Sequence, residues 1–155
     1  MVHRGIATLS GAMMLCFLIL SGLDTQFFFL HFYESLIYLV IILMLFYFAD
    51  HWAYMLGIMA PTVWILQQLV MGFLWNVLRS TASYVTGGER PTGTDVITVL
   101  TAILAVMMII FCVRHWRREF SGLGKFWPTF VGSLVVIIIY YGILWYWFGS
   151  LFPWK

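Results

Sequence analysis

The sequence predicts an all-α integral membrane protein, a bundle of about five transmembrane helices. Hydrophobic residues make up 63% of its 155 residues and charged residues only 9%, whereas about a quarter of the residues in soluble domains are charged. Mean hydropathy is +0.98. Apolar runs of roughly 20 residues, the length that crosses a hydrocarbon core about 30 Å thick, recur along the chain. We therefore expect a single membrane domain over residues 1–155, in contact with the lipid bilayer.

The first two predicted spans cover residues 5–23 and 27–49, and a short polar turn at residues 24–26 joins them. The first span follows the basic residue Arg4, and a basic residue followed by an apolar run is also the pattern of a signal peptide. It lacks a small-residue cleavage site, however, and we expect it to be retained as a helix.

The third predicted span covers residues 52–78. A very short turn at Asp50 and His51 separates it from the second span, so these two helices are expected to be antiparallel neighbours. Pro61 lies inside the third span and is expected to kink it, because proline lacks the backbone donor of a helical hydrogen bond. An exposed outer loop over residues 80–94, rich in glycine and polar residues, follows.

The fourth and fifth predicted spans cover residues 95–113 and 126–148, with a basic inner loop at 114–125 between them. Lys and Arg concentrate on the cytoplasmic side of membrane proteins. The N-terminus, four spans earlier, falls on the same side as this loop. We therefore expect a cytoplasmic N-terminus and an outside C-terminus in a cell membrane, of the bacterial inner-membrane type. Candidate lipid-headgroup contacts are the basic residues of the loop, Arg114, Arg117, Arg118 and Lys125.

Four polar residues within apolar sequence form the candidate intramembrane site: His31, Glu34, Gln67 and Gln68. Helix rise places Glu34 roughly 6 Å inside the outer boundary of the hydrocarbon. Acids at such depth mark ion or proton pathways or are paired structurally. For Glu34 the structural partner would be His31, three residues earlier, or Arg79. Adjacent residues point about 100° apart on a helix, so Gln67 and Gln68 cannot both face the same neighbour.

No catalytic residue, metal site or cofactor of the chain's own is predicted. A haem held by two histidines needs both imidazoles at one depth, and His31 is predicted near the outer boundary while His51 and His115 are predicted near the inner one. A haem or pigment shared with a partner chain stays open. The net charge of +2 is explained by basic residues beside membrane spans, so nucleic acid is not an expected partner.

Three functional hypotheses follow. The first is a non-enzymatic accessory subunit of a larger membrane complex, of the kind that surrounds respiratory or photosynthetic electron-transport cores, with other membrane subunits as partners. The second is a small homo-oligomeric transporter or channel that uses Glu34 and His31 at its outer mouth and Gln67 or Gln68 at the midplane. The third is a haem- or quinone-binding anchor that carries electrons and depends on His31 together with His51 or His115.

Overall fold

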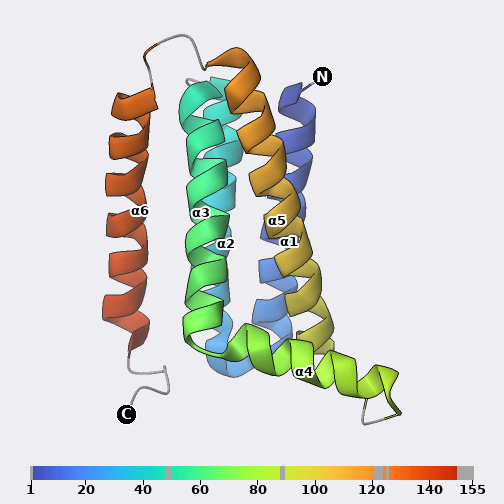
Figure 1. The fold of residues 1–155 in the computed structure, drawn as a ribbon. Coiled ribbons are helices and arrows are strands. Elements are labelled where there is room, and N and C mark those ends of the chain that lie inside the picture. Colours follow the sequence, from blue (N-terminus) through green and yellow to red (C-terminus); the bar gives the residue numbers. More distant parts are fainter. Residues whose placement is uncertain (1, 48–49, 88–89, 121–123, 125, 150–155) are drawn as a thin grey trace.

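The computed structural model describes residues 2–47, 50–87, 90–120, 124 and 126–149, and every regular element in these ranges is helical (Figure 1). Five long helices are each apolar and long enough to cross a membrane. This confirms the prediction of an all-helical, multi-pass membrane protein. The long helices are α1 (Val2–Leu23), α2 (Phe28–Tyr47), α3 (Asp50–Val70), α5 (Gly93–Glu119) and α6 (Phe126–Phe148), joined by a 3-10 turn η1 (Thr25–Phe27) and a shorter helix α4 (Phe73–Val85).

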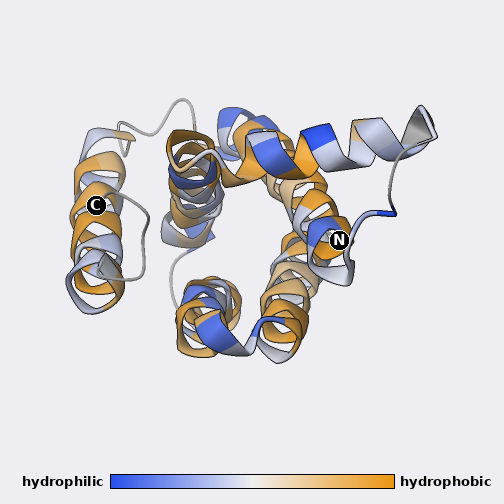
Figure 2. Ribbon diagram, turned by 90° about the horizontal axis from the view of Figure 1, so that it is seen from below, coloured by the Kyte–Doolittle hydropathy of each residue, from blue (hydrophilic) through white to orange (hydrophobic). Residues whose placement is uncertain are grey.

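The long helices alternate in direction along the chain, so the N-terminus and the last turn of α6 lie at opposite ends of the bundle (Figure 1). Helices α1, α2, α3 and α5 pack around one apolar core. Helix α6 stands to one side of them and packs mainly against α3 (Figure 2). Because α3 contacts all of α2, α4, α5 and α6, it is the most buried of the five long helices.

The predicted third span, residues 52–78, is divided into two helices in the structure. Helix α3 ends at Val70, and Gly72 has a φ of +73°, a left-handed conformation that favours glycine and ends helices. The chain then turns, and α4 lies across the end of the bundle (Figure 1). The helix over residues 73–85 is amphipathic, with an apolar and a polar face. This pattern is typical of a surface helix and not of a membrane span. The predicted outer loop at 80–94 is therefore helical as far as Val85.

The predicted basic loop at 114–125 is also helical over its first half, because α5 continues to Glu119. Residues 114–119 contain no glycine or proline, and positive charge near a helix C-terminus is favourable. Lys125 lies outside the described residues. The other three predicted headgroup contacts are Arg114, Arg117 and Arg118, and all three are exposed. They lie at the end of the bundle that also holds the N-terminus (Figure 1).

Two further predictions concern α3 and α6. Asp50 and His51, the predicted turn, form the first turn of α3, and the connection to α2 passes through residues 48–49, outside the described residues. Helix α3 continues through Pro61. The Tyr141 hydroxyl donates to the Ala60 carbonyl beside it at 3.1 Å. Helix α6 has the predicted bounds, 126–148.

Small residues allow the helices to approach closely at the end opposite α4. A Cβ atom added at Gly57 of α3 would lie 2.7 Å from Sγ of Cys112 in α5. One added at Gly132 of α6 would collide with the indole ring of Trp52. Packing of this kind is the main source of helix association in a bilayer, where the hydrophobic effect does not drive helices together. Close packing of complementary helix surfaces therefore stabilises this half of the bundle.

Candidate functional site

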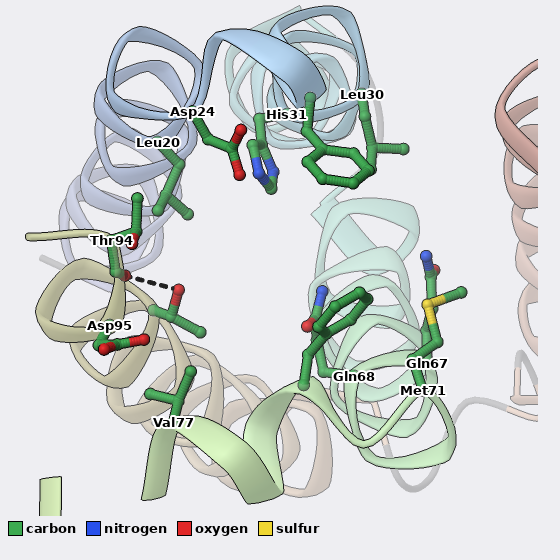
Figure 3. A pocket seen from close by; sticks show the side chains of 13 residues that line it. Leu20, Asp24, Leu30, His31, Gln67, Gln68, Met71, Val77, Thr94 and Asp95 are labelled. Carbon is green, nitrogen blue, oxygen red and sulfur yellow. Dashed lines mark hydrogen bonds between the residues drawn. The ribbon is translucent and has the colours of Figure 1, made fainter. Parts of the chain in front are cut away.

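A cavity of about 170 Å³ lies at the end of the bundle that α4 crosses, here called the α4 end (Figure 3). Six elements meet there: the end of α1 with the following residue, η1, the start of α2, the end of α3, α4 and the start of α5. The cavity combines an apolar half with a set of polar side chains. The apolar residues are Leu20, Phe27, Leu30, Met71, Phe73 and Val77; the polar ones are Asp24, His31, Gln67, Gln68, Thr94, Asp95 and Thr98.

The described lining of the cavity holds two acids and a histidine but no lysine or arginine. Asp24 and Asp95 contribute carboxylates and His31 an imidazole, whereas none of the lining residues that the structure describes is Lys or Arg. In Figure 3 the Asp24 carboxylate and the His31 ring lie next to one another and point into the cavity. Charges inside low-dielectric walls act more strongly than in water. The cavity is therefore suited to a positively charged ligand.

His31 joins the cavity to a buried acid. Its Nδ1 lies 3.0 Å from Oε2 of Glu34, three residues further along α2, where the two side chains share a helix face. Glu34 is 1% exposed and does not line the cavity, whereas His31 does. The imidazole thus stands between the cavity and the carboxylate. Of the two partners predicted for Glu34, the structure pairs it with His31.

The second Glu34 oxygen belongs to a group of buried polar atoms that have no hydrogen-bond partner among the described residues. The same holds for the hydroxyls of Tyr54 and Ser133, near the starts of α3 and α6, and for Oε1 of Gln67, the hydroxyl of Tyr38 and Nε1 of Trp64. Phe17 packs between the last two, stacked on Tyr38 at 5.5 Å and edge-on to Trp64 at 5.4 Å. An unpaired buried polar atom costs about 1–3 kcal/mol. Polar groups retained at such cost are typical of a site that meets a ligand or water.

The two glutamines take different positions around α3. The Gln68 amide points into the cavity, while the Gln67 side chain lies along the flank of the helix next to Met71 (Figure 3). Gln67 is buried and Gln68 is half-buried. This agrees with the prediction that adjacent residues cannot face the same neighbour.

Asp95 is held in place by the start of α5. Its Oδ2 accepts a hydrogen bond from the Thr92 backbone N–H at 3.1 Å, and its own N–H donates to the Thr92 hydroxyl, which completes a capping box. The Ser80 hydroxyl of α4 donates to the same carboxylate oxygen at 3.3 Å. Asp95 therefore ties α4 to α5 at the cavity wall.

A pair of tyrosines fastens α6 to α2 close to Glu34. The rings of Tyr33 and Tyr140 stack with centroids 4.5 Å apart. The Tyr33 hydroxyl donates to the Tyr140 carbonyl at 3.2 Å, and the Tyr140 hydroxyl donates to the Tyr33 carbonyl. The exchange is reciprocal, so neither hydroxyl is left unpaired in the apolar interior. We call this pair the tyrosine clasp.

The structure brings together three of the four predicted site residues in the cavity, and places the fourth, Glu34, directly behind one of them. The sequence prediction missed both aspartates, because each lies at the end of a predicted span. It also missed the clasp, although the adjacent tyrosines Tyr140 and Tyr141 inside an apolar span are a polar signal of the same kind as the glutamines. Arg79, the other predicted partner of Glu34, is exposed on α4.

The histidine pairing required by the haem hypothesis is not made. His31 lies in the first turn of α2, and His51 lies in the first turn of the antiparallel helix α3, at the other end of the bundle (Figure 1). His51 and His115 instead pack near Phe120 and Phe111, with ring centroids 6.0 and 4.7 Å apart. Within the described ranges no three His, Cys, Asp or Glu side chains gather as a metal site would require.

No known family model, curated protein or solved structure matches this chain.

Proposed function

We propose that this protein binds a small organic cation in the cavity at the α4 end and acts as a small transporter. The observation that carries this proposal is that Asp24, Asp95 and His31 line one cavity whose described lining has no Lys or Arg. An ammonium group donates hydrogen bonds to carboxylate and amide oxygens, which this lining supplies. The apolar half of the cavity suits the carbon skeleton of such a cation.

The buried acid behind the cavity supports transport over simple binding. Glu34 is connected to the cavity through its hydrogen bond with His31. A cation that binds beside the imidazole therefore interacts electrostatically with both side chains. Intramembrane acids facing a bundle interior are typical of ion and proton pathways. The far half of the bundle is filled by apolar side chains, so release on that side requires α3 to move; Pro61 weakens that helix at its middle.

The test is equilibrium dialysis of radiolabelled methylammonium against the protein in nanodiscs, together with uptake into proteoliposomes. Replacing Asp24 with Asn removes a carboxylate from the cavity without changing its shape. We expect the Kd for methylammonium to rise about tenfold, equivalent to about 1.4 kcal/mol. Uptake should fall in parallel.

The matched control is Glu119→Gln, which removes an exposed carboxylate at the opposite end of α5. It should leave both the Kd and the uptake rate unchanged. Equal affinities of the wild type, Asp24→Asn and Glu119→Gln proteins would refute cation binding in this cavity. Binding without uptake would refute transport alone.

A second candidate is the accessory subunit, and the observation that favours it is the lateral position of α6. Tyr146 is 86% exposed, and Trp127 and Trp147 of the same helix are also largely exposed. Exposed aromatic side chains at both ends of α6 fit a neighbouring membrane subunit as well as lipid. Purification from native membranes in mild detergent, with mass spectrometry of the accompanying chains, tests it: stoichiometric larger subunits support it, and a chain that runs alone refutes it. Electron transport stays a prediction from composition.

A further inference from the structure

A second hollow, of about 350 Å³, lies between α4 and α5, further along α5 than the cation cavity; we call it the α4/α5 groove. All of its lining residues are apolar: Leu74, Leu78, Val99, Ala102, Ile103, Val106 and Met107. Three of the α5 residues, Ile103, Val106 and Met107, are about half exposed. The groove therefore opens to the surroundings of the bundle.

The position of the groove places it in the hydrocarbon. Helix α5 is one of the five spans, and α4 lies across its first turns at the end of the bundle (Figure 1). Hence α4 is level with the headgroup region, and the part of α5 that lines the groove, from Val99 onward, lies deeper. At that depth an apolar hollow that faces outward is in contact with acyl chains, since water is excluded there.

The face of α4 next to the groove carries groups that recognise a phospholipid headgroup. Leu74 and Leu78, one turn apart, face the groove; Trp75 and Arg79, also one turn apart, lie about 100° further around the helix. Trp75 is 68% exposed, and indole rings favour the headgroup level. Arg79 is the only charged residue of α4, is exposed, and forms no ion pair with any residue that the structure describes.

We propose that the α4/α5 groove is a binding site for one anionic phospholipid. An acyl chain occupies the groove, and the phosphate accepts hydrogen bonds from the Arg79 guanidinium, whose planar donors match phosphate oxygens. The charge of α4 selects the headgroup, because a cationic helix without acids attracts anionic lipid more than zwitterionic lipid. The cation cavity is lined instead by Phe73 and Val77 of α4, which lie about 100° around the helix from Leu74 and Leu78, so the two sites share no lining residue.

The test measures lipid retained by the protein after extraction from nanodiscs that contain equal amounts of phosphatidylglycerol and phosphatidylcholine. Native mass spectrometry gives the number and the class of lipids bound. We expect the wild type to retain phosphatidylglycerol about fivefold over phosphatidylcholine, the ratio that one basic residue near a membrane surface supplies. Arg79→Gln should bring that ratio close to one.

Two further variants separate the headgroup from the chain. Arg90→Gln removes an exposed arginine from the loop between α4 and α5, outside the groove lining, and should leave the ratio unchanged. Ala102→Trp fills the groove and should remove the tightly bound lipid of either class. The proposal is overturned if Arg90→Gln lowers the ratio as much as Arg79→Gln does, or if Ala102→Trp retains as much lipid as the wild type.

A photo-reactive benzophenone amino acid in place of Ile103 identifies the occupant in native membranes. Adducts with phospholipid are expected, since Ile103 lines the groove and is 52% exposed. An adduct with another protein or with a second copy of the chain, in place of lipid, would make the groove a helix-docking surface and overturn the lipid assignment. Methylammonium binding is measured on the same samples. A negative result for lipid binding is thereby distinguished from a negative result for the proposed cation binding.

Discussion

The two ends of the bundle are built by different means. At the α4 end, charged and amide side chains surround a cavity, and several buried polar atoms have no partner among the described residues. At the opposite end, a Cβ atom added at Gly57 or Gly132 would collide with Cys112 or Trp52, so the helices are closely packed there. The hydroxyls of Tyr54 and Ser133 are also buried at that end without a partner among the described residues. Unpaired polar atoms are costly and close packing is favourable. The comparison indicates that close packing at one end contributes stability to a bundle whose other end holds a polar cavity.

The largest expected effect on stability concerns the hydrogen-bonded pair His31 and Glu34 of the polar end. His31→Leu removes the hydrogen-bonding partner of Glu34, which is 1% exposed, and leaves the buried carboxyl group without a partner among the described residues. Loss of one partner from a buried pair costs about 3–5 kcal/mol, whereas replacing both partners with apolar residues is often neutral. We therefore expect His31→Leu to lower the unfolding temperature in detergent strongly, and the double variant His31→Leu/Glu34→Leu to recover most of that loss.

The double variant is the control for this prediction. If it unfolds at the same temperature as His31→Leu, the two side chains are not energetically coupled. Methylammonium binding should be lost in both variants, because both remove the imidazole from the cavity wall. The double variant thus distinguishes the two properties, because it should recover stability without recovering methylammonium binding.

The next largest effect concerns the packed end. Gly57→Leu places a side chain where even a Cβ atom would lie 2.7 Å from Cys112 Sγ, so α3 and α5 have to separate. Overpacking of this kind costs about 1–3 kcal/mol, and thermal unfolding followed by size-exclusion chromatography measures it. Gly142→Leu, in α6, is the matched control, because a Cβ added there would meet no other side chain or helix within 4 Å. Equal unfolding temperatures for the two variants would contradict the assigned role of close packing.

Much of the fold could be predicted from hydropathy, and the exceptions have particular causes. Helix α6 has its predicted bounds because its apolar run has clear polar ends. The end of α3 was missed because apolar residues continue on both sides of Gly72, and one glycine is a weak signal when its conformation is unknown. The end of α5 was missed because the basic run that starts at Arg114 predicts a loop, although charge alone does not end a helix.

The site was predictable where it is local in sequence. His31 and Glu34 are three residues apart, and helix geometry brings them together. Asp24 and Asp95 are far apart in the chain and line the same cavity only because the end of α1 and the start of α5 lie side by side, which hydropathy does not specify. The tyrosine clasp joins residues 107 positions apart for the same reason.

Loss of the tyrosine clasp, which lies between the two ends, is expected to lower the unfolding temperature by an intermediate amount. Tyr140→Phe removes the hydroxyl that donates to the Tyr33 carbonyl, and Tyr33→Phe removes the reciprocal donor. Each hydrogen bond contributes about 1 kcal/mol, and a double-mutant cycle measures their coupling through unfolding temperatures. Trp127→Phe, an exposed change on the same helix α6, should have no effect. A Tyr140→Phe protein as stable as the Trp127→Phe protein would show that the clasp does not hold α6.

The smallest expected effect distinguishes two adjacent side chains. Gln68→Leu removes the amide that points into the cavity and should weaken methylammonium binding about threefold, equivalent to about 0.6 kcal/mol for one lost hydrogen bond. Gln67→Leu removes a buried Oε1 that has no partner among the described residues, so it should raise the unfolding temperature and leave affinity nearly unchanged. Gln26→Leu, on exposed η1, is the control for loss of an amide. Because Gln67 and Gln68 are neighbours, an equal loss of affinity in both variants would mean that the cavity acts through its shape and not through one directed amide.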